Sequence, residues 1–237
     1  MASPKKLQAI VKSVIHHSDT VIEYTFIPEG RIPSFKPGQF LHLAIDPYDP
    51  SKNWPDSRVF SIANAPESNI IRIIISIKGK YTARMAAELV EGSVVWLKFP
   101  YGSFTFESTG HHVVLIAGGT GISPYVSFLE HCLVSESSPD ISLYYGVREE
   151  QYIIFGMILE KCKEMLPLFN YTSFCEGPIQ KPHQYLRGGM INVTQILSEN
   201  KSDSDFYISG PPLMIEHIRQ SLLENQISPG RIFLDEW

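Results

Sequence analysis

The feature that most constrains this chain is a glycine-rich turn between an apolar run and a helical pattern. The apolar run is Val113 to Ile116, the turn contains Gly118-Gly119-Thr120-Gly121, and apolar residues at helical spacing follow from Val126. Such a strand, turn and helix start let backbone N–H groups approach an anion, and the helix N-terminus adds partial positive charge. Ser123 suits the N-cap and Pro124 the first helical position. The segment therefore predicts a phosphate-binding turn, although a tight strand-to-helix turn without a ligand fits the same residues.

The turn departs from the common nucleotide motifs in two ways. Pro124 stands where G-x-G-x-x-G would place its third glycine, and no Lys follows the turn. The missing Lys argues against a P-loop, so the sequence favours a phosphate site of another kind.

Composition narrows the class of protein. The 237 residues are enough for one large domain or two small ones, and 43% of them are hydrophobic. The net charge of −5, without a long basic block, argues against nucleic acid as the main partner. No run approaches the ~20 apolar residues of a membrane span, and the N-terminus lacks an apolar core. We expect a soluble cytoplasmic protein that does not bind a membrane.

Cysteine usage gives no sign of a metal site. Cys132, Cys162 and Cys175 lie far apart and form no C-x-x-C pair, which argues against an iron–sulfur cluster or a disulfide framework. We interpret them as buried thiols and expect no metal.

Two halves with different patterns follow one another. The first, residues 1–108, has about six β-rich runs and one helical patch near 82–90, which predicts a six-stranded antiparallel β-barrel. The second, residues 109–237, alternates five strand-like runs with helices near 124–136, 153–165, 193–199 and 212–225. That alternation predicts a parallel five-stranded α/β sheet with right-handed crossovers.

Two segments of the first half carry groups suited to a cofactor. Arg58-Val59-Phe60-Ser61 supplies a cation, an aromatic ring and a hydroxyl on one strand, with Ser61 on the face opposite to Phe60. Lys78-Gly79-Lys80-Tyr81-Thr82 joins a strand to the helical patch, and its N–H groups suit a pyrophosphate. Each segment also fits an ordinary strand or turn.

Two more glycine turns end strands of the second half. Gly146 and Arg148 follow one strand, and Ser209-Gly210-Pro211 with Met214 follows another. Open parallel sheets bind ligands beyond the carboxyl ends of their strands, where all three glycine turns are expected. Three such turns are harder to explain by chance than one.

The order and spacing of these motifs resemble the ferredoxin–NADP⁺ reductase-like flavoprotein family over nearly the whole chain. Five segments carry the resemblance: 58–61, 79–82, 118–124, 145–148 and 210–214. The resemblance implies a FAD-binding barrel, residues 1–108, followed by an NAD(P)-binding domain, residues 109–237. The length, Phe60 and the C-terminal segment are also similar to the compact NAD(P)H–flavin reductases.

The resemblance implies roles for the matching residues. Arg58, Val59, Phe60 and Ser61 would contact the flavin, with Arg58 on its phosphates, Phe60 stacked on the isoalloxazine and Ser61 near N5. Lys78, Gly79, Lys80, Tyr81 and Thr82 would hold the pyrophosphate of FAD, and Trp237 would shield either the other face of the flavin or its adenine. The residues expected around NAD(P)H are Gly119, Thr120, Gly121, Pro124, Gly146, Arg148, Gly210, Pro211 and Met214. The expected catalytic residues are Ser61, Ser209 and Asp235.

Departures from the family pattern affect three of these positions. Phe60 replaces the usual Tyr and so lacks a hydroxyl, Ser209 replaces a Cys, and Asp235 is often Glu. Ser173 is followed by Phe174 where an Arg would favour NADPH, although Lys181 and Arg187 lie nearby. We therefore expect NADH to be preferred.

The function implied is transfer of hydride from NAD(P)H to FAD and of electrons onward to a separate acceptor. A ferredoxin, a flavodoxin or an oxygenase component fits that acceptor. Two alternatives remain: a reductase that uses free flavin as a diffusible substrate, and an electron-transfer subunit of a larger complex.

Overall fold

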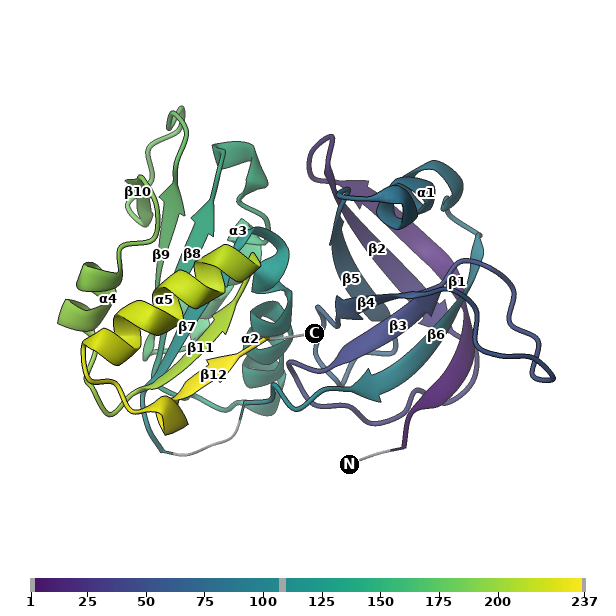
Figure 1. The fold of residues 1–237 in the computed structure, drawn as a ribbon, viewed down its shortest axis with the longest axis horizontal. Helices are drawn as coiled ribbons and strands as arrows, with labels where there is room; N and C mark the ends of the chain where they lie inside the picture. Colours follow the sequence, from purple (N-terminus) through teal and green to yellow (C-terminus); the bar gives the residue numbers. More distant parts are fainter. Residues whose placement is uncertain (1–2, 107–109, 236–237) are drawn as a thin grey trace. The chain divides into compact units, whose positions relative to one another are not determined.

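The computed structural model of the protein describes residues 3–106 and 110–235 (Figure 1). The chain divides into two compact units, Met1–Phe106 with Val126–His131, and Glu107–Tyr125 with Cys132–Trp237. The predicted boundary at residue 108 lies outside the described residues and stays a prediction.

The first unit contains the expected six-stranded antiparallel barrel. Its strands pair in the order β4-β3-β6-β1-β2-β5. Their bounds are β1 Lys5–His16, β2 Val21–Pro28, β3 Phe40–Ala44, β4 Arg58–Ser61, β5 Ile71–Ser76 and β6 Val94–Tyr101. Apolar side chains alternate into one core, as period-2 patterning requires, so Leu43 and Leu97 face inward together.

Asn64 nearly closes the barrel between β4 and β5. Its side chain is 1% exposed, donates to Ala65 O at 2.9 Å and Ile70 O at 3.0 Å, and accepts from Arg72 N at 2.6 Å. The Ala63 N–H also donates to Arg72 O at 2.8 Å. A side-chain amide therefore satisfies backbone groups where regular strand pairing stops.

Helix α1, Lys80–Glu88, buries Tyr81 and Met85 in the barrel core. It begins two residues before the predicted 82–90 patch. Gly79 is its N-cap, and Thr82 reaches back to accept hydrogen bonds from the Lys78 and Gly79 N–H groups at 3.0 and 3.2 Å. Thr82 therefore contributes to the cap as expected, but from the third helical position, since Gly79 is the N-cap residue.

The second unit is a parallel sheet in the order β10-β9-β8-β7-β11-β12, with one strand more than predicted. The bounds are β7 Val113–Gly118, β8 Ile141–Val147, β9 Phe169–Cys175, β10 Leu186–Gly188, β11 Asp205–Ser209 and β12 Ile232–Leu234. The extra strand, β10, is too short to show a periodic pattern. Both β7 and β11 are buried throughout, as central strands covered on both faces should be.

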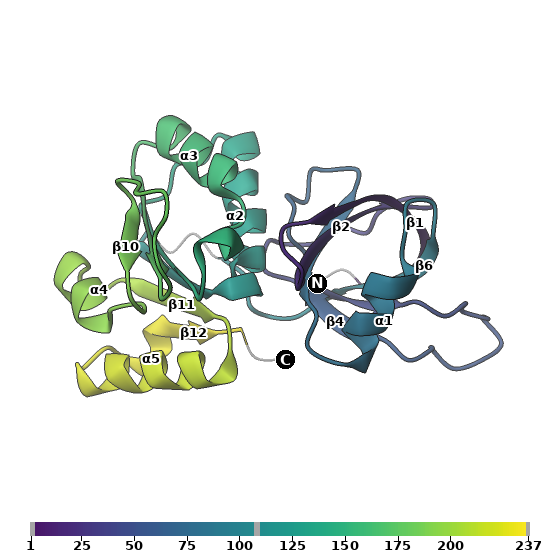
Figure 2. The same ribbon diagram turned by 90° about the horizontal axis from the view of Figure 1, so that it is seen from above.

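Helices cover both faces of this sheet, α2 and α3 on one and α4 and α5 on the other (Figure 2). Their bounds are α2 Ser123–Ser135, α3 Gly156–Met165, α4 Val193–Glu199 and α5 Pro212–Glu224. Short 3₁₀ turns lie at Gly119–Ile122, Glu150–Tyr152 and Pro229–Arg231. The predicted helices agree, except that α3 starts at residue 156, after the 3₁₀ turn, and not at 153. No helix in the described part of the chain has the length and apolar character needed to cross a bilayer.

The chain order places a topological switch point between β7 and β11. From β7 the chain moves outward to β8, β9 and β10, and then returns to β11 on the other side of β7. Ligands of open parallel sheets bind beyond the carboxyl ends of the strands at such a point.

The barrel seam gives a test of this architecture. We expect Asn64→Ala to lower the free energy of unfolding by about 2–4 kcal/mol, because it leaves buried backbone groups without partners. Asn53→Ala is the matched control, since Asn53 is exposed in a loop. Urea denaturation followed by circular dichroism measures both, and equal stability of the two variants would contradict this account of the seam.

Candidate cofactor and nucleotide sites

In the first unit, Arg58 and the start of α1 lie together. The Arg58 guanidinium stands over the Tyr81 ring, 4.7 Å from its centroid, although the two residues are far apart in sequence. It also pairs with Asp56 at 2.7 Å, and about half of the Arg58 side chain is exposed. An exposed pair of this kind contributes only ~0–1 kcal/mol. The guanidinium can therefore exchange Asp56 for an anionic ligand at little cost.

Tyr81 holds this arrangement in place. Its hydroxyl donates to Leu43 O at 2.8 Å, accepts from Ile45 N at 3.1 Å and lies 3.3 Å from Asp56 O. Burial raises the pKa of Tyr81 to about 12, so the hydroxyl remains a donor at neutral pH. The hydroxyl thus has a structural task, while the ring supports Arg58.

The residues beside Tyr81 are open to a ligand. Lys78, Gly79 and Lys80 are exposed, and a Cβ added at Gly79 would meet no atom within 4 Å. The first turn of α1 therefore combines two ammonium groups and a helix N-terminus with the Arg58 guanidinium. That combination suits a diphosphate.

Strand β4 separates its expected flavin residues by face, as alternation requires. Phe60 is 8% exposed and belongs to the barrel core, so its stacking role stays a prediction. Val59 and Ser61 lie on the other face of the strand, Val59 opposite His42 and Ser61 opposite Phe40, and Ser61 is itself only 7% exposed. The outer face of β4 thus presents a hydroxyl beside aromatic rings.

In the second unit, the glycine turns after β7, β8 and β11 meet at one edge of the sheet. Ser209 lies opposite Ala117, and Gly118 lies opposite Gly146. A Cβ added at Gly121 would lie 2.4 Å from Ser209 O, and one at Gly118 would lie 2.5 Å from the Met214 sulfur. Gly121 is therefore needed for backbone packing between the two turns, whereas Gly118 leaves room for the Met214 and Pro211 side chains.

The neighbouring positions show the same crowding. A Cβ at Gly210 would approach Met214 Cε to 2.7 Å, and one at Gly146 would approach Ile191 to 2.8 Å. Pro211 also packs against Gly118, and Pro124 is buried in the first turn of α2. Several expected nucleotide residues thus shape the turns through packing.

Gly119 differs from these glycines. Its φ is +55°, and a Cβ there would meet nothing within 4 Å. Thr120 beside it is half-buried, and Arg148 at the end of β8 is exposed. Gly119 is therefore the position at which a phosphate can approach the backbone of this turn.

The prediction that Ser123 is the N-cap of α2 is wrong. Ser123 is the first helical residue, after the cap Ile122, and its hydroxyl donates to Thr120 O at 2.8 Å. The 3₁₀ turn before α2 moves the cap back by one residue and turns Ser123 inward. Pro124 is consequently the second helical residue and not, as was predicted, the first, although it lies in the first turn.

Two of the expected catalytic residues contact each other. Ser209, 2% exposed, donates from Oγ to Asp235 Oδ2 at 2.8 Å. Their strands are parallel neighbours, and the Asp235 N–H donates to Ile208 O at 3.0 Å. Trp237 lies outside the described residues, so its expected role is untested.

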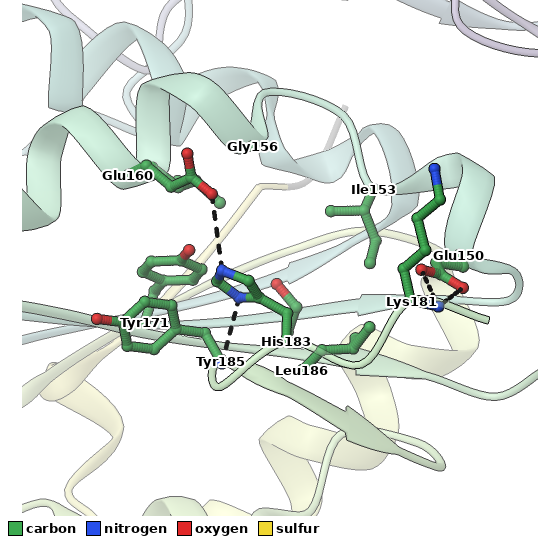
Figure 3. Close-up of a pocket in the computed structure, with 11 residues that line it drawn as sticks. Glu150, Ile153, Gly156, Glu160, Tyr171, Lys181, His183, Tyr185 and Leu186 are labelled. Carbon is green, nitrogen blue, oxygen red and sulfur yellow. Dashed lines mark hydrogen bonds and ion pairs between the residues drawn. The ribbon is translucent and has the colours of Figure 1, made fainter. Parts of the chain in front are cut away.

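A cavity of about 210 Å³ lies between α3, β9 and the segment that leads to β10 (Figure 3). The Tyr171 and Tyr185 rings lie 4.5 Å apart in it, and His183 Nε2 lies 3.7 Å from Glu160. Ser173 also lines the cavity, is 3% exposed, and its Oγ has no hydrogen-bond partner among the described residues. A buried hydroxyl without a partner is rare and indicates a missing ligand or water.

Sequence reasoning did not identify this cavity. Ser173 and Lys181 entered the sequence analysis only for the choice between NADH and NADPH. Tyr171, His183 and Tyr185 belong to no motif identified there. The signal available was the cluster of ring and basic side chains in the crossover between residues 181 and 185. The three cysteines are buried thiols, which confirms their interpretation.

The packed glycine turns give a second test. We expect Gly121→Ala to lower the free energy of unfolding by about 1–3 kcal/mol, because the added methyl group meets the backbone of Ser209. Gly188→Ala in β10 is the control, since a Cβ there meets nothing within 4 Å. Thermal unfolding of both variants measures the difference, and a Gly121→Ala protein as stable as the control would refute the packing role.

Comparison with known proteins agrees with this geometry. The model of the oxidoreductase NAD-binding domain family matches residues 115–220. The 2-halobenzoate 1,2-dioxygenase electron transfer component of Burkholderia cepacia is 25% identical over 228 residues, which cover 93% of this chain and 64% of that protein. The anthranilate 1,2-dioxygenase electron transfer component of Acinetobacter baylyi is 28% identical over 209 residues, covering 86% of this chain and 58% of that protein. The chain spans less than two thirds of the length of these relatives.

Solved structures share the fold over the whole chain. The Amycolatopsis cytochrome P450 reductase GcoB superposes with a TM-score of 0.83 at 22% identity, covering 100% of this chain and 71% of that one. A ferredoxin NADP⁺ reductase from Neisseria gonorrhoeae gives a TM-score of 0.75 at 21% identity, covering 99% and 98%. The chain is thus similar to the oxidoreductase NAD-binding domain family over residues 115–220, and it has the same two-domain fold as these solved reductases.

Proposed function

We propose that this chain is an NAD(P)H-dependent FAD oxidoreductase that passes electrons to a separate acceptor. The observation that carries the proposal is that each unit has its own anion-binding arrangement. One is Arg58 on Tyr81 beside the start of α1. The other is the set of glycine turns at the switch point between β7 and β11.

The barrel residues fit FAD. Arg58, Lys78, Lys80 and the open backbone at Gly79 would hold the diphosphate, and Ser61 on the outer face of β4 would lie near the flavin ring. FAD, when bound, supplies acceptance of a hydride at N5 and release of single electrons. The Neisseria gonorrhoeae reductase of the same fold has FAD and NADP bound, which supports the assignment.

The second unit fits a nicotinamide nucleotide. Gly119 gives the pyrophosphate access to the turn after β7, and the exposed Arg148 adds a positive charge at the end of β8. The cavity at β9 is smaller than the ~300–1,000 Å³ that encloses a whole drug-sized ligand, so it would take one end of the dinucleotide. Tyr171, Tyr185 and the Ser173 hydroxyl suit a flat, hydrogen-bonding adenine ring.

Ser209 and Asp235 would order the site at the end of β11. The Ser209 hydroxyl donates a hydrogen bond to the Asp235 carboxylate, which fixes the orientation of both side chains. Ordered polar groups at the reacting end of a nucleotide contribute by positioning it.

Preference for NADH is the finer part of the proposal. Phe174 is an uncharged and buried residue, so this position offers no cation to a 2′-phosphate. Arg187 donates to the Gln184 and Leu186 carbonyls at 2.8 and 3.1 Å, and Glu150 and Glu160 add acidic groups at the cavity. Only Lys181 among the cavity residues brings a full positive charge, and His183 faces Glu160.

The acceptor follows from the relatives. The Burkholderia and Acinetobacter proteins are electron transfer components of dioxygenases, so an oxygenase component, a ferredoxin or a flavodoxin fits the acceptor of this chain. Use of free flavin as a diffusible substrate and service as an electron-transfer subunit are the two rival functions.

The absorbance of the purified full-length chain tests the proposal. We expect a yellow protein with bound FAD, whose absorbance is bleached by NADH without oxygen and at higher catalytic efficiency than by NADPH. A colourless protein that turns over only with added flavin would establish the rival flavin reductase. Bound FAD that neither nucleotide reduces would favour the electron-transfer subunit, and equal or better efficiency with NADPH would refute the preference.

Ser209 gives a residue-level test. We expect Ser209→Ala to slow reduction of FAD by NADH in single turnover by roughly tenfold, because Asp235 loses the group that orients it. Ser204→Ala is the control, since Ser204 is equally buried and bonds to His112 at 3.2 Å at the start of β11. Stopped-flow absorbance measures both rates, and an unchanged rate for Ser209→Ala would leave Ser209 a structural residue.

A further inference from the structure

The cavity at β9 contains a carboxylate that occupies an anion-binding arrangement of the backbone. Glu150, the first residue of the 3₁₀ turn after β8, lines this cavity (Figure 3). The Gln180 N–H donates to Glu150 Oε2 at 2.6 Å, and the Lys181 N–H donates to Oε1 and Oε2 at 3.1 and 3.3 Å. Consecutive backbone N–H groups that point to one anion form a nest. We call the Gln180 and Lys181 N–H groups the 180–181 nest.

Other hydrogen bonds hold the segment that carries the nest. Before it, the Gly177 N–H donates to Arg148 O at 2.8 Å. After it, Tyr185 O accepts from the Ser173 N–H of β9 at 2.7 Å. Neither bond involves the Glu150 side chain, so we expect the nest to keep its shape when that side chain is shortened. Donors that are already in position bind a ligand at a lower entropic cost.

Two further groups of the cavity suit an anionic ligand. The Lys181 side chain is exposed, and its ammonium forms no ion pair within the described residues. The Ser173 hydroxyl is buried in the same cavity and has no hydrogen-bond partner there. Two backbone N–H groups, an ammonium and a hydroxyl are donors that a phosphate monoester accepts from.

Glu150 closes this donor set to such a ligand. Its carboxylate takes both nest N–H groups, and its negative charge lies where the phosphate would bind. A phosphate monoester carries about −1.5 to −2 charges at pH 7, so the two anions would repel each other. A site that places an unfavourable group against one ligand discriminates by that group as well as by its attractive contacts.

The proposed function identifies the ligand group concerned, and the argument rests on that function. In it the cavity takes the adenine end of the nucleotide between Tyr171 and Tyr185. NADH and NADPH differ only at this end, where the ribose carries a 2′-hydroxyl in NADH and a 2′-phosphate in NADPH. The 2′ substituent is therefore the group that would meet Glu150.

We propose that Glu150 determines nucleotide specificity by occupying the 180–181 nest, which would otherwise bind the 2′-phosphate of NADPH. Two other origins of a preference for NADH lead to different results. If the absence of a cation next to Ser173 decides the preference, removal of Glu150 has no effect. If charge repulsion alone decides it, removal of the charge is sufficient, whether or not the nest stays filled.

The test measures binding of 2′-phospho-AMP and of AMP to the purified full chain by calorimetry. These probes carry the adenine end alone, so binding does not depend on turnover of FAD. We expect Glu150→Ala to tighten binding of 2′-phospho-AMP by roughly tenfold or more and to change that of AMP by less than about twofold. Glu150→Gln keeps an acceptor oxygen in the nest without the charge, and we expect it to give less than about a third of that gain.

Glu149→Ala is the matched control. It removes the same charge from the neighbouring residue, which is exposed and accepts from the Gln151 amide at 2.8 Å. We expect it to leave the affinity for both probes unchanged. Glu150→Ser opens the nest with a small polar side chain as a second variant, and circular dichroism checks the folding of every variant.

The proposal is overturned if Glu150→Ala and Glu150→Ser gain no affinity for 2′-phospho-AMP, or if they gain as much for AMP. An equal gain in Glu150→Gln or in Glu149→Ala would overturn it too, because charge alone would then be the cause. Bleaching of bound FAD by NADH is measured in parallel on the wild-type chain. Its absence would refute the proposed function, whereas intact bleaching with unchanged binding of 2′-phospho-AMP would refute only this inference.

Discussion

Close packing between the turns after β7 and β11 is the constraint on which the C-terminal unit depends. At Gly121 and Gly118 a single methyl group would collide with the backbone or side chains of the opposite turn. These two strands meet at the switch point, where the chain reverses its direction across the sheet. Gly118 and Gly121 therefore allow the two turns to pack together at this edge of the sheet. Gly119 differs from them, because a Cβ there would meet no atom within 4 Å.

That edge brings chemically distinct groups together in a fixed order. Ser209 ends β11 and holds Asp235, Gly119 opens the turn after β7, and the Ser173 cavity lies farther along at β9. In the proposed function these three places would take the reacting end, the phosphates and the ring of an extended dinucleotide. In the barrel, Tyr81 has an analogous part, because its hydroxyl ties the β3 end and the following loop together while its ring carries Arg58.

The two faces of the barrel strands carry different kinds of side chain. The inner face is a continuous apolar core. On the outer face Lys98 lies directly opposite Lys6, with His42 on its other side, and the two lysine ammonium groups repel each other. Aromatic rings offset part of that repulsion through cation–π contacts. The residues that fold the barrel thus lie on one face of these strands, and the charged residues lie on the other.

The sequence by itself determined the order of the two patterns and all the strands and helices except the short β10, because hydrophobic periodicity and glycine turns are local signals. It also marked Arg58 and Ser209, since their motifs are contiguous. Only the tertiary structure decided that Ser209 meets Asp235, that Arg58 rests on Tyr81, and that Lys98 faces two other basic groups. Those contacts join residues that are distant in the sequence. They depend on the order and register of the strands, which no short stretch of sequence specifies by itself.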